Sequence, residues 1–528
     1  MDKKQKSYSL NLKTPITGDL TGTKQNILIN AEIISLFSIH INSLQVRKTT
    51  MLTTTQYRSL LFMFITSCLL LAGCVNTIPD KQWQHVCKSG VCTKDELTNF
   101  IQTKYCTIDT NNRNAKCPDN IITNTRTITT FQKSYLEYNA VDGSLRDPQQ
   151  LKAIKGYIQQ KVDSGKNILI AIYIHGWHHN AAPKDSNLIQ FDNLLARYVG
   201  GLQQLGKKDV EVLGIYVGWQ GEIYKGAFNF QTIGNRANVA DVIGSRGAAI
   251  NHPGRGLKQD LTELADTMRK ANADNHMIVM GHSLGGRMIA RAFLPGLVHN
   301  AQTLGDNTLL VTINAAVDST TFDDAYRPDQ LSSQPDYPIW LNLTSKEDTA
   351  TKVYYPWAHR MGYLAPWGFS NIKTLGHTTE RITHQLGVQF CSPDKNTPSQ
   401  CAPWEKLFST IQPVWTTAEP YHFSVLTYGA KPRLNKRPPL TQCVLLTRYP
   451  LTEQAKVALN NSPLCPGLRE DFDTAAHPNP LPAKGKMWNI RTDASVIDNE
   501  TAKRREYPDH NAYIQTDLVT MLLQLVYR

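Results

Sequence analysis

One stretch of the chain, residues 277–293, constrains the fold more than any other. It opens with Met277-Ile-Val-Met280, a short apolar run that is typical of a buried strand. The run leads directly into Gly281-His-Ser-Leu-Gly285, and the residues that follow have the composition of a helix. A strand that turns at once into a helix strains its backbone, so Gly281 and Gly285 must be small to avoid clashes. The sequence therefore predicts a sharp strand-to-helix turn that carries Ser283 above the edge of a sheet.

Apolar runs recur along the chain and alternate with amphipathic segments. Residues 167–174, 210–217 and 308–317 are rich in β-branched residues and are typical of strands covered on both faces. Residues 339–343 and 487–492 have the same character. Most of the segments between them repeat apolar residues every three to four positions, which indicates helices. This alternation predicts an α/β fold with a doubly wound, mostly parallel sheet, whose functional groups lie at the carboxyl ends of the strands.

The turn around Ser283 resembles the nucleophile elbow of serine hydrolases that have the α/β-hydrolase fold. The succession of Tyr135-Leu-Glu-Tyr138, His175-Gly-Trp177, Gly218-Trp-Gln-Gly221 and Gly281-His-Ser-Leu-Gly-Gly286 is similar to a group of largely uncharacterised bacterial and fungal α/β-hydrolase-like proteins. The likeness covers roughly residues 130–350 and the segment around His510. It implies the fold and a catalytic triad and leaves the substrate open.

The order of catalytic residues in that family is serine, then acid, then histidine. The resemblance implies Ser283 as the nucleophile and His510 as the base, because His510 lies between the last predicted strand and the terminal helix. The acid is expected after the strand at residues 339–343, where Asp348 fits, with Glu347 and Asp318 as alternatives. The acid would accept the second ring N–H of the histidine and fix its tautomer.

The resemblance also implies an oxyanion hole made by the backbone N–H groups of Trp177 and Leu284. Two converging donors are needed where negative charge develops on the reacting carbonyl oxygen. Three histidines close together, His175, His178 and His179, raise the alternative of a metal site. Their spacing matches no common zinc motif, so we expect no metal and no organic cofactor.

The segment that begins at Met51 reads as an export signal. A lone basic residue and the apolar run 60–71 precede Leu-Ala-Gly-Cys74, which resembles the lipobox of bacterial lipoproteins. That resemblance implies a lipidated Cys74 and a protein anchored in the cell envelope, and Val75 favours the outer membrane. A plain secretory signal or an apolar anchor is the alternative. Residues 1–50 are then expected to be upstream translation, with Met51 as the true start.

Export also bears on the cysteines. Apart from one cysteine in the signal and Cys74, an even number remains, which in an oxidising compartment indicates disulfides. They form one set before the hydrolase motifs and one set late in the chain: Cys87, Cys92, Cys106, Cys117, Cys391, Cys401, Cys443 and Cys465. We expect pairing within each set, and a pair of zinc sites is the alternative.

The predicted organisation has six regions. They are an upstream extension (1–50), a lipoprotein signal peptide (51–73), a tether with cysteines (74–130), the first part of the hydrolase core (131–348), a long insertion (349–483), and the last strand, the histidine loop and the terminal helix (484–528). The insertion separates the last two predicted strands, lacks regular periodicity and contains cysteines. It is expected to form a disulfide-braced cap over Ser283, with an insertion remote from the site as the alternative.

The net charge of +12 is spread along the chain without a basic run or stripe, so we expect no nucleic-acid binding. The leading hypothesis is a membrane-anchored serine hydrolase, similar to a carboxylesterase or lipase, that works through an acyl-enzyme. Its partners would be a small-molecule or lipid ester and, through Cys74, the membrane. The sequence does not rank lipids, short esters, thioesters and amides. A non-catalytic surface lipoprotein that uses the fold for binding is the alternative.

Overall fold

The structure is a computed structural model, and all of the residues it describes belong to the unit Asn76–Arg528. The described residues are 100–108, 115–116, 128–223, 232–248, 253–270, 274–298, 304–326, 338–360, 372–391, 423–427, 441–448, 487–492, 510 and 516–527. The export signal, Cys74, Cys87, Cys92, Cys117, Cys401 and Cys465 lie outside them. Among the described residues, no helix is both long and apolar enough to cross a membrane.

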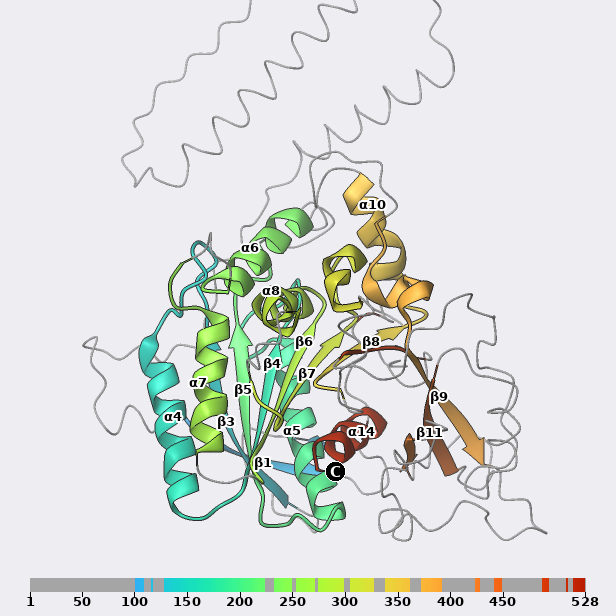
Figure 1. Cartoon of the computed structure of the whole chain (residues 1–528). Helices are drawn as coiled ribbons and strands as arrows, with labels where there is room; N and C mark the ends of the chain where they lie inside the picture. Colours follow the sequence, from blue (N-terminus) through green and yellow to red (C-terminus); the bar gives the residue numbers. More distant parts are fainter. Residues whose placement is uncertain are drawn as a thin grey trace, which may run out of the picture. The chain divides into compact units, whose positions relative to one another are not determined.

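A single mixed sheet forms the centre of the described part, with strand order β10-β11-β9-β12-β8-β7-β6-β4-β5-β3-β1-β2 (Figure 1). The strands from β9 to β3 in this order run parallel to one another, and antiparallel strands extend both edges. The parallel strands are β3 (Ile128–Glu137), β4 (Ile168–Ile174), β5 (Glu211–Gly218), β6 (His276–His282), β7 (Thr308–Ile313), β8 (Trp340–Ser345), β9 (His384–Cys391) and β12 (Met487–Thr492). The predicted α/β class is confirmed.

The central strands form where the sequence offers continuous apolar residues. Every residue of β4 is buried, and so is every residue of β7 and β8. Helices therefore have to cover both faces of the sheet, as expected for a parallel sheet. A strand that were exposed on one face would instead alternate apolar and polar residues.

Two hydrophobic clusters lie on opposite faces of the sheet. One contains buried side chains of α4 (Pro148–Asp163), α6 (Ile233–Ser245), α7 (Leu257–Arg269) and α8 (Leu284–Val298). The other contains those of α5 (Ser186–Gln204) and α14 (Thr516–Val526), as Figure 1 shows. The sheet is therefore wound on both faces.

Two of these helices begin at aspartate caps. The Asp147 side chain accepts a hydrogen bond from the Gln149 N–H, and Pro148 occupies the first helical position of α4. The Asp185 side chain likewise accepts from the Asn187 N–H at the start of α5. Such caps satisfy backbone donors that have no partner within the helix. They fix the residue at which a helix begins after β3 and after β4, near the carboxyl edge of the sheet.

The expectation that residues 349–483 lack regular structure is wrong for part of this segment. The strand β9 pairs in parallel with β12, and β11 (Thr441–Arg448) and β10 (Phe423–Thr427) continue the same sheet in antiparallel register. Outer strands such as these take their order from pairing rather than from a strong apolar pattern. A cap over Ser283 stays a prediction, since most of the segment lies outside the described residues.

The N-terminal cysteine region also contributes to the sheet. The strand β1 (Gln102–Ile108) pairs antiparallel with β3, and β2 (Ala115–Lys116) pairs with β1. Cys106 lies on β1, is fully buried and is disulfide-bonded. Part of the region expected to be a tether is therefore an edge of the main sheet. The pairing of the eight cysteines stays a prediction.

Candidate functional site

Ser283 occupies the turn between β6 and α8. The strand ends at His282 and the helix begins at Leu284, so a single residue makes the turn. The backbone of Ser283 has a φ of 55°, in the left-handed region that residues with a side chain seldom occupy. Such conformations persist where the surrounding structure enforces them, and they concentrate at functional sites. The predicted sharp turn is therefore present.

Close packing explains the two glycines that flank this serine. A Cβ atom on Gly281 would lie 2.5 Å from the carbonyl oxygen of Gly285. A Cβ atom on Gly285 would lie 2.2 Å from the carbonyl oxygen of Ile174, at the end of β4. Both distances are shorter than any van der Waals contact, so only glycine fits at either position. The motif thus lets α8 begin directly against the neighbouring strand.

His510 and Asp348 lie in direct contact at the same edge of the sheet. The Nδ1 atom of His510 lies 3.0 Å from both carboxylate oxygens of Asp348. A carboxylate accepts only, so Nδ1 carries the proton, and in the neutral ring Nε2 is then left as the acceptor. The His510 ring also lies 4.7 Å, centroid to centroid, from that of His282, the residue next to Ser283. A histidine whose Nε2 can accept a proton in the neutral ring is thus held beside the turn.

The carboxylate of Asp348 is fully buried and saturated with donors. It accepts the Ala350 N–H at 3.0 Å and the Thr351 hydroxyl in addition to His510. Burial alone would raise the pKa of Asp348, but the charge and hydrogen bond of His510 and the Thr351 hydroxyl together hold it below its ordinary value. The residue therefore stays ionised and acts as a hydrogen-bond acceptor.

The two alternative acids lie elsewhere. Asp318 accepts a hydrogen bond from the Tyr355 hydroxyl at 2.9 Å, and its Oδ1 lies 3.0 Å from Nε2 of His359. The Glu347 side chain is exposed. Among the three carboxylates, Asp348 is the one that the structure places against His510.

The His175-Gly-Trp177 turn packs against the serine. A Cβ atom on Gly176 would lie 2.9 Å from Cβ of Ser283. Within the described part of the chain, neither the Trp177 nor the Leu284 backbone N–H has a hydrogen-bond partner. The Trp177 ring is fixed by its own N–H, which donates to the Thr232 hydroxyl at 3.0 Å. Two unengaged amides therefore flank Ser283 on the elements where the oxyanion donors are expected.

The three neighbouring histidines have different surroundings. His175 stacks on Trp219, and its Nε2 accepts the Trp219 backbone N–H at 3.1 Å. His179 is held by Asp185 through Nδ1 at 3.0 Å. His178 has a φ of 70°, and its buried Nε2 has no hydrogen-bond partner among the described residues. The rings thus serve different local contacts, and the described residues include no group of three or more His, Cys, Asp or Glu side chains placed to share a metal ion.

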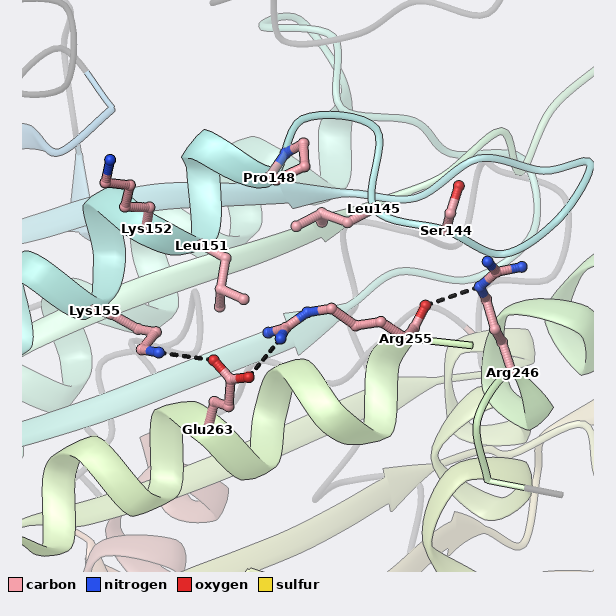
Figure 2. Close-up of a pocket in the computed structure, with 9 residues that line it drawn as sticks. All are labelled: Ser144, Leu145, Pro148, Leu151, Lys152, Lys155, Arg246, Arg255 and Glu263. Atoms are coloured by element: carbon pink, nitrogen blue, oxygen red, sulfur yellow. Dashed lines mark hydrogen bonds and ion pairs between the residues drawn. The ribbon is translucent and has the colours of Figure 1, made fainter. Parts of the chain in front are cut away.

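A separate pocket of about 510 Å³, whose lining does not include Ser283, lies between α4 and α7 (Figure 2). Apolar side chains, Leu145, Pro148 and Leu151, form part of its lining. Its cations are largely engaged within the protein. Lys155 and Arg255 both pair with Glu263, and Arg255 also pairs with Asp260. The one hydroxyl in its lining, that of Ser144, donates to Asp142 at 2.7 Å, and no histidine lines the pocket, so its size does not mark it as a catalytic site.

Comparisons with known proteins add little to this geometry. No protein-family model matches the chain, and no curated protein matches it. One solved structure with local similarity is the phospholipase PlaB from Legionella pneumophila in complex with thio-NAD, at 12% sequence identity and a TM-score of 0.20. The match covers 42% of this chain and 46% of that chain, so it spans less than half of the phospholipase. A TM-score of 0.20 is too low to indicate a shared fold.

Proposed function

We propose that this protein is a serine hydrolase of the α/β-hydrolase fold that cleaves carboxylic esters. The observation that carries the proposal is the contact of His510 Nδ1 with both oxygens of Asp348, at 3.0 Å, beside the Ser283 turn. The order of the three residues along the chain agrees with that fold. The strand order and the winding on both faces give it further support.

In the proposed reaction, Ser283 Oγ attacks the ester carbonyl carbon while His510 Nε2 takes the hydroxyl proton. Asp348 stays ionised, keeps the proton on Nδ1 and stabilises the imidazolium that forms. The Trp177 and Leu284 N–H groups donate to the oxygen that becomes negative. The imidazolium then gives its proton to the departing alcohol, and an acyl-enzyme remains. A water molecule, deprotonated by His510, releases the acid and restores Ser283.

We further propose that the enzyme is exported and tethered to the cell envelope through Cys74. The support is the apolar run 60–71 followed by Leu-Ala-Gly-Cys74. Tethering to a membrane favours an ester with an apolar acyl chain as substrate, because such esters concentrate at that surface. Labelling of cells with an alkyne fatty acid should tag the wild-type protein, and Cys74→Ser should abolish the tag. Equal tagging of both proteins would refute the anchor without touching the hydrolase proposal.

The hydrolase proposal is tested by a series of p-nitrophenyl esters of increasing acyl length. Wild-type protein should hydrolyse at least part of the series, and Ser283→Ala should lower kcat by at least about a thousandfold. Ser134→Ala is the matched control, because Ser134 is buried on β3 and its hydroxyl has no partner among the described residues. Ester hydrolysis that survives Ser283→Ala would reject Ser283 as the nucleophile. Absence of hydrolysis in wild type, with no labelling by a fluorophosphonate, would reject the enzyme in favour of a binding protein.

A further inference from the structure

We propose that His282 and Asn314 are positioning residues that hold the base, His510, by its backbone carbonyl oxygen. The inference rests on the proposed function, because it concerns how the base is held in position within the proposed triad. Within the described residues, the hydrogen-bond partners of His510 are three side chains: Asp348 on the ring, and His282 and Asn314 on the carbonyl. Both ends of the residue are thus fixed independently.

The contact of His282 is short and leaves one choice of tautomer. Its Nε2 lies 2.7 Å from the His510 carbonyl oxygen. A carbonyl oxygen only accepts, so Nε2 of His282 must carry the proton. The residue is the last of β6 and immediately precedes Ser283. The same short segment therefore carries the nucleophile and a donor that fixes the base.

Asn314 supplies the second donor, and its amide orientation is fixed by its other partner. Its Nδ2 donates to the His510 carbonyl at 3.1 Å, while its Oδ1 accepts the Ser345 N–H at 3.0 Å. Its backbone N–H donates to the Leu343 carbonyl at 2.8 Å, and its φ is 46°. Asparagine tolerates this left-handed conformation better than most residues do. The position is thus suited to an amide that faces the base.

The geometry of the sheet explains why one residue can be held from three elements. His282 ends β6, Asn314 directly follows β7, and Asp348 follows β8. These strands are parallel neighbours, so their carboxyl ends meet at one edge. Adjacent strands are about 4.8 Å apart, so the three ends span about 10 Å, which side chains around a single histidine can bridge.

The charge state of His282 suits this role. Burial, followed by the nearby charge of His510, lowers its pKa well below the ordinary value. The ring therefore stays neutral and donates a hydrogen bond without adding a positive charge beside the imidazolium formed in the proposed reaction. A permanently charged donor in its place would oppose protonation of His510.

Steady-state kinetics in the wild-type and His510→Ala backgrounds test the proposal. His282→Met removes the donor at similar size, and Asn314→Asp removes the donor while keeping the left-handed preference. Each should lower kcat about tenfold to a hundredfold with little change in KM. His282→Gln, whose amide can still donate, should recover most of the loss. In a His510→Ala background the same changes should alter the residual rate less than about twofold, because no imidazole is left to misplace. Unchanged kcat in both donor variants, or equal losses in both backgrounds, would overturn the proposal.

A spectroscopic measurement separates this inference from the proposed function. The Nδ1 proton of His510, held by Asp348, should give a downfield proton resonance that is absent in His510→Ala. His282→Met and Asn314→Asp should shift or broaden it, and His282→Gln should leave it close to the wild-type position. An unaffected resonance in both donor variants would refute the positioning role of His282 and Asn314, even in an active enzyme. A shifted resonance in a protein that hydrolyses no ester would support the positioning role and refute the proposed hydrolase function.

Discussion

Two aspartates, Asp318 and Asp348, occupy comparable places and have different surroundings. Each lies a few residues past the end of a central strand, Asp318 after β7 and Asp348 after β8. Asp348 is fully buried and contacts His510, which is 162 positions away in the sequence. Asp318 retains about a fifth of its side-chain exposure and contacts Tyr355 and His359. Similar positions on the sheet therefore do not define similar roles.

The Asp318 region is organised around a different charge. Arg287 of α8 donates to the Tyr355 hydroxyl at 3.1 Å and also pairs with Asp241 of α6. Tyr355 begins α10 (Tyr355–Arg360), so the network ties this helix to the rest of the fold. The acid is thus identified by the partner that tertiary structure brings to it. A matched pair of variants tests whether the two aspartates differ in role.

The largest contrast is expected between Asp348→Asn and Asp318→Asn. An asparagine at position 348 can present its N–H₂ group to Nδ1 and favour the wrong tautomer, which costs about 10⁴ in kcat in a related triad. Asp318→Asn should change kcat by less than about tenfold and should mainly lower the free energy of unfolding. The measurement is kcat on one ester, together with urea unfolding of both variants. Loss of kcat in Asp318→Asn alone would reverse the assignment.

The next effect concerns the turn that packs against the serine. Gly176→Ala would place a Cβ atom 2.9 Å from Ser283 Cβ and 3.1 Å from the His282 carbonyl oxygen. The turn must then move, and a shift of about 1 Å can cost about a hundredfold in rate. Gly156→Ala is the matched control, because its added Cβ would meet nothing within 4 Å on the exposed face of α4. That control should keep full kcat and gain about 0.5–1 kcal/mol of stability. Equal kcat in both variants would contradict the packing of this turn.

The smallest effect is a loss of stability in acid. Burial lowers the pKa of His175 and of His377 to about 4, against the ordinary value of 6.5. As the pH falls below about 6.5, the unfolded chain binds protons that the folded protein does not, so stability falls until the folded histidines titrate near pH 4. Each should contribute a loss of about 2 kcal/mol between about pH 6.5 and about pH 5. Urea unfolding at these two pH values measures it.

His377→Gln provides the control for this pH dependence. The variant should lose less stability than wild type over the same interval, because one of the buried rings whose pKa is lowered is gone. The carboxylates whose pKa is lowered by folding, Asp348 among them, lose their contribution only at lower pH. A protein that is equally stable at both pH values would contradict the neutral, buried state of these histidines.

The sequence predicts the centre of this fold and leaves its edges open. The apolar runs of β4, β5 and β6 are long enough to specify strands without further context. The outer strands β9 and β11 have no comparable pattern, because their order depends on pairing with residues far along the chain. Local pattern cannot encode a partner that only the complete sheet supplies.

The same contrast holds at the site. The Ser283 turn is a local motif, so its φ and its two glycines follow from a few adjacent residues. The donors to the His510 carbonyl, His282 and Asn314, lie 228 and 196 positions away from it. Both donate to a backbone oxygen, which every residue type carries, so the residue types near His510 do not indicate these contacts. The choice of Asp348 over Asp318 likewise needs the three-dimensional contact, because both follow a strand.

The central claim, that Ser283 is a nucleophile activated by His510 and Asp348, is tested most directly by fluorophosphonate labelling followed by peptide mass spectrometry. Wild type and Asp318→Asn should each give a single adduct on Ser283, formed at similar rates. Labelling should be slowed by orders of magnitude in Asp348→Asn and absent in Ser283→Ala. An adduct on another residue, or equal labelling of Asp348→Asn and Asp318→Asn, would refute the roles assigned to these three residues.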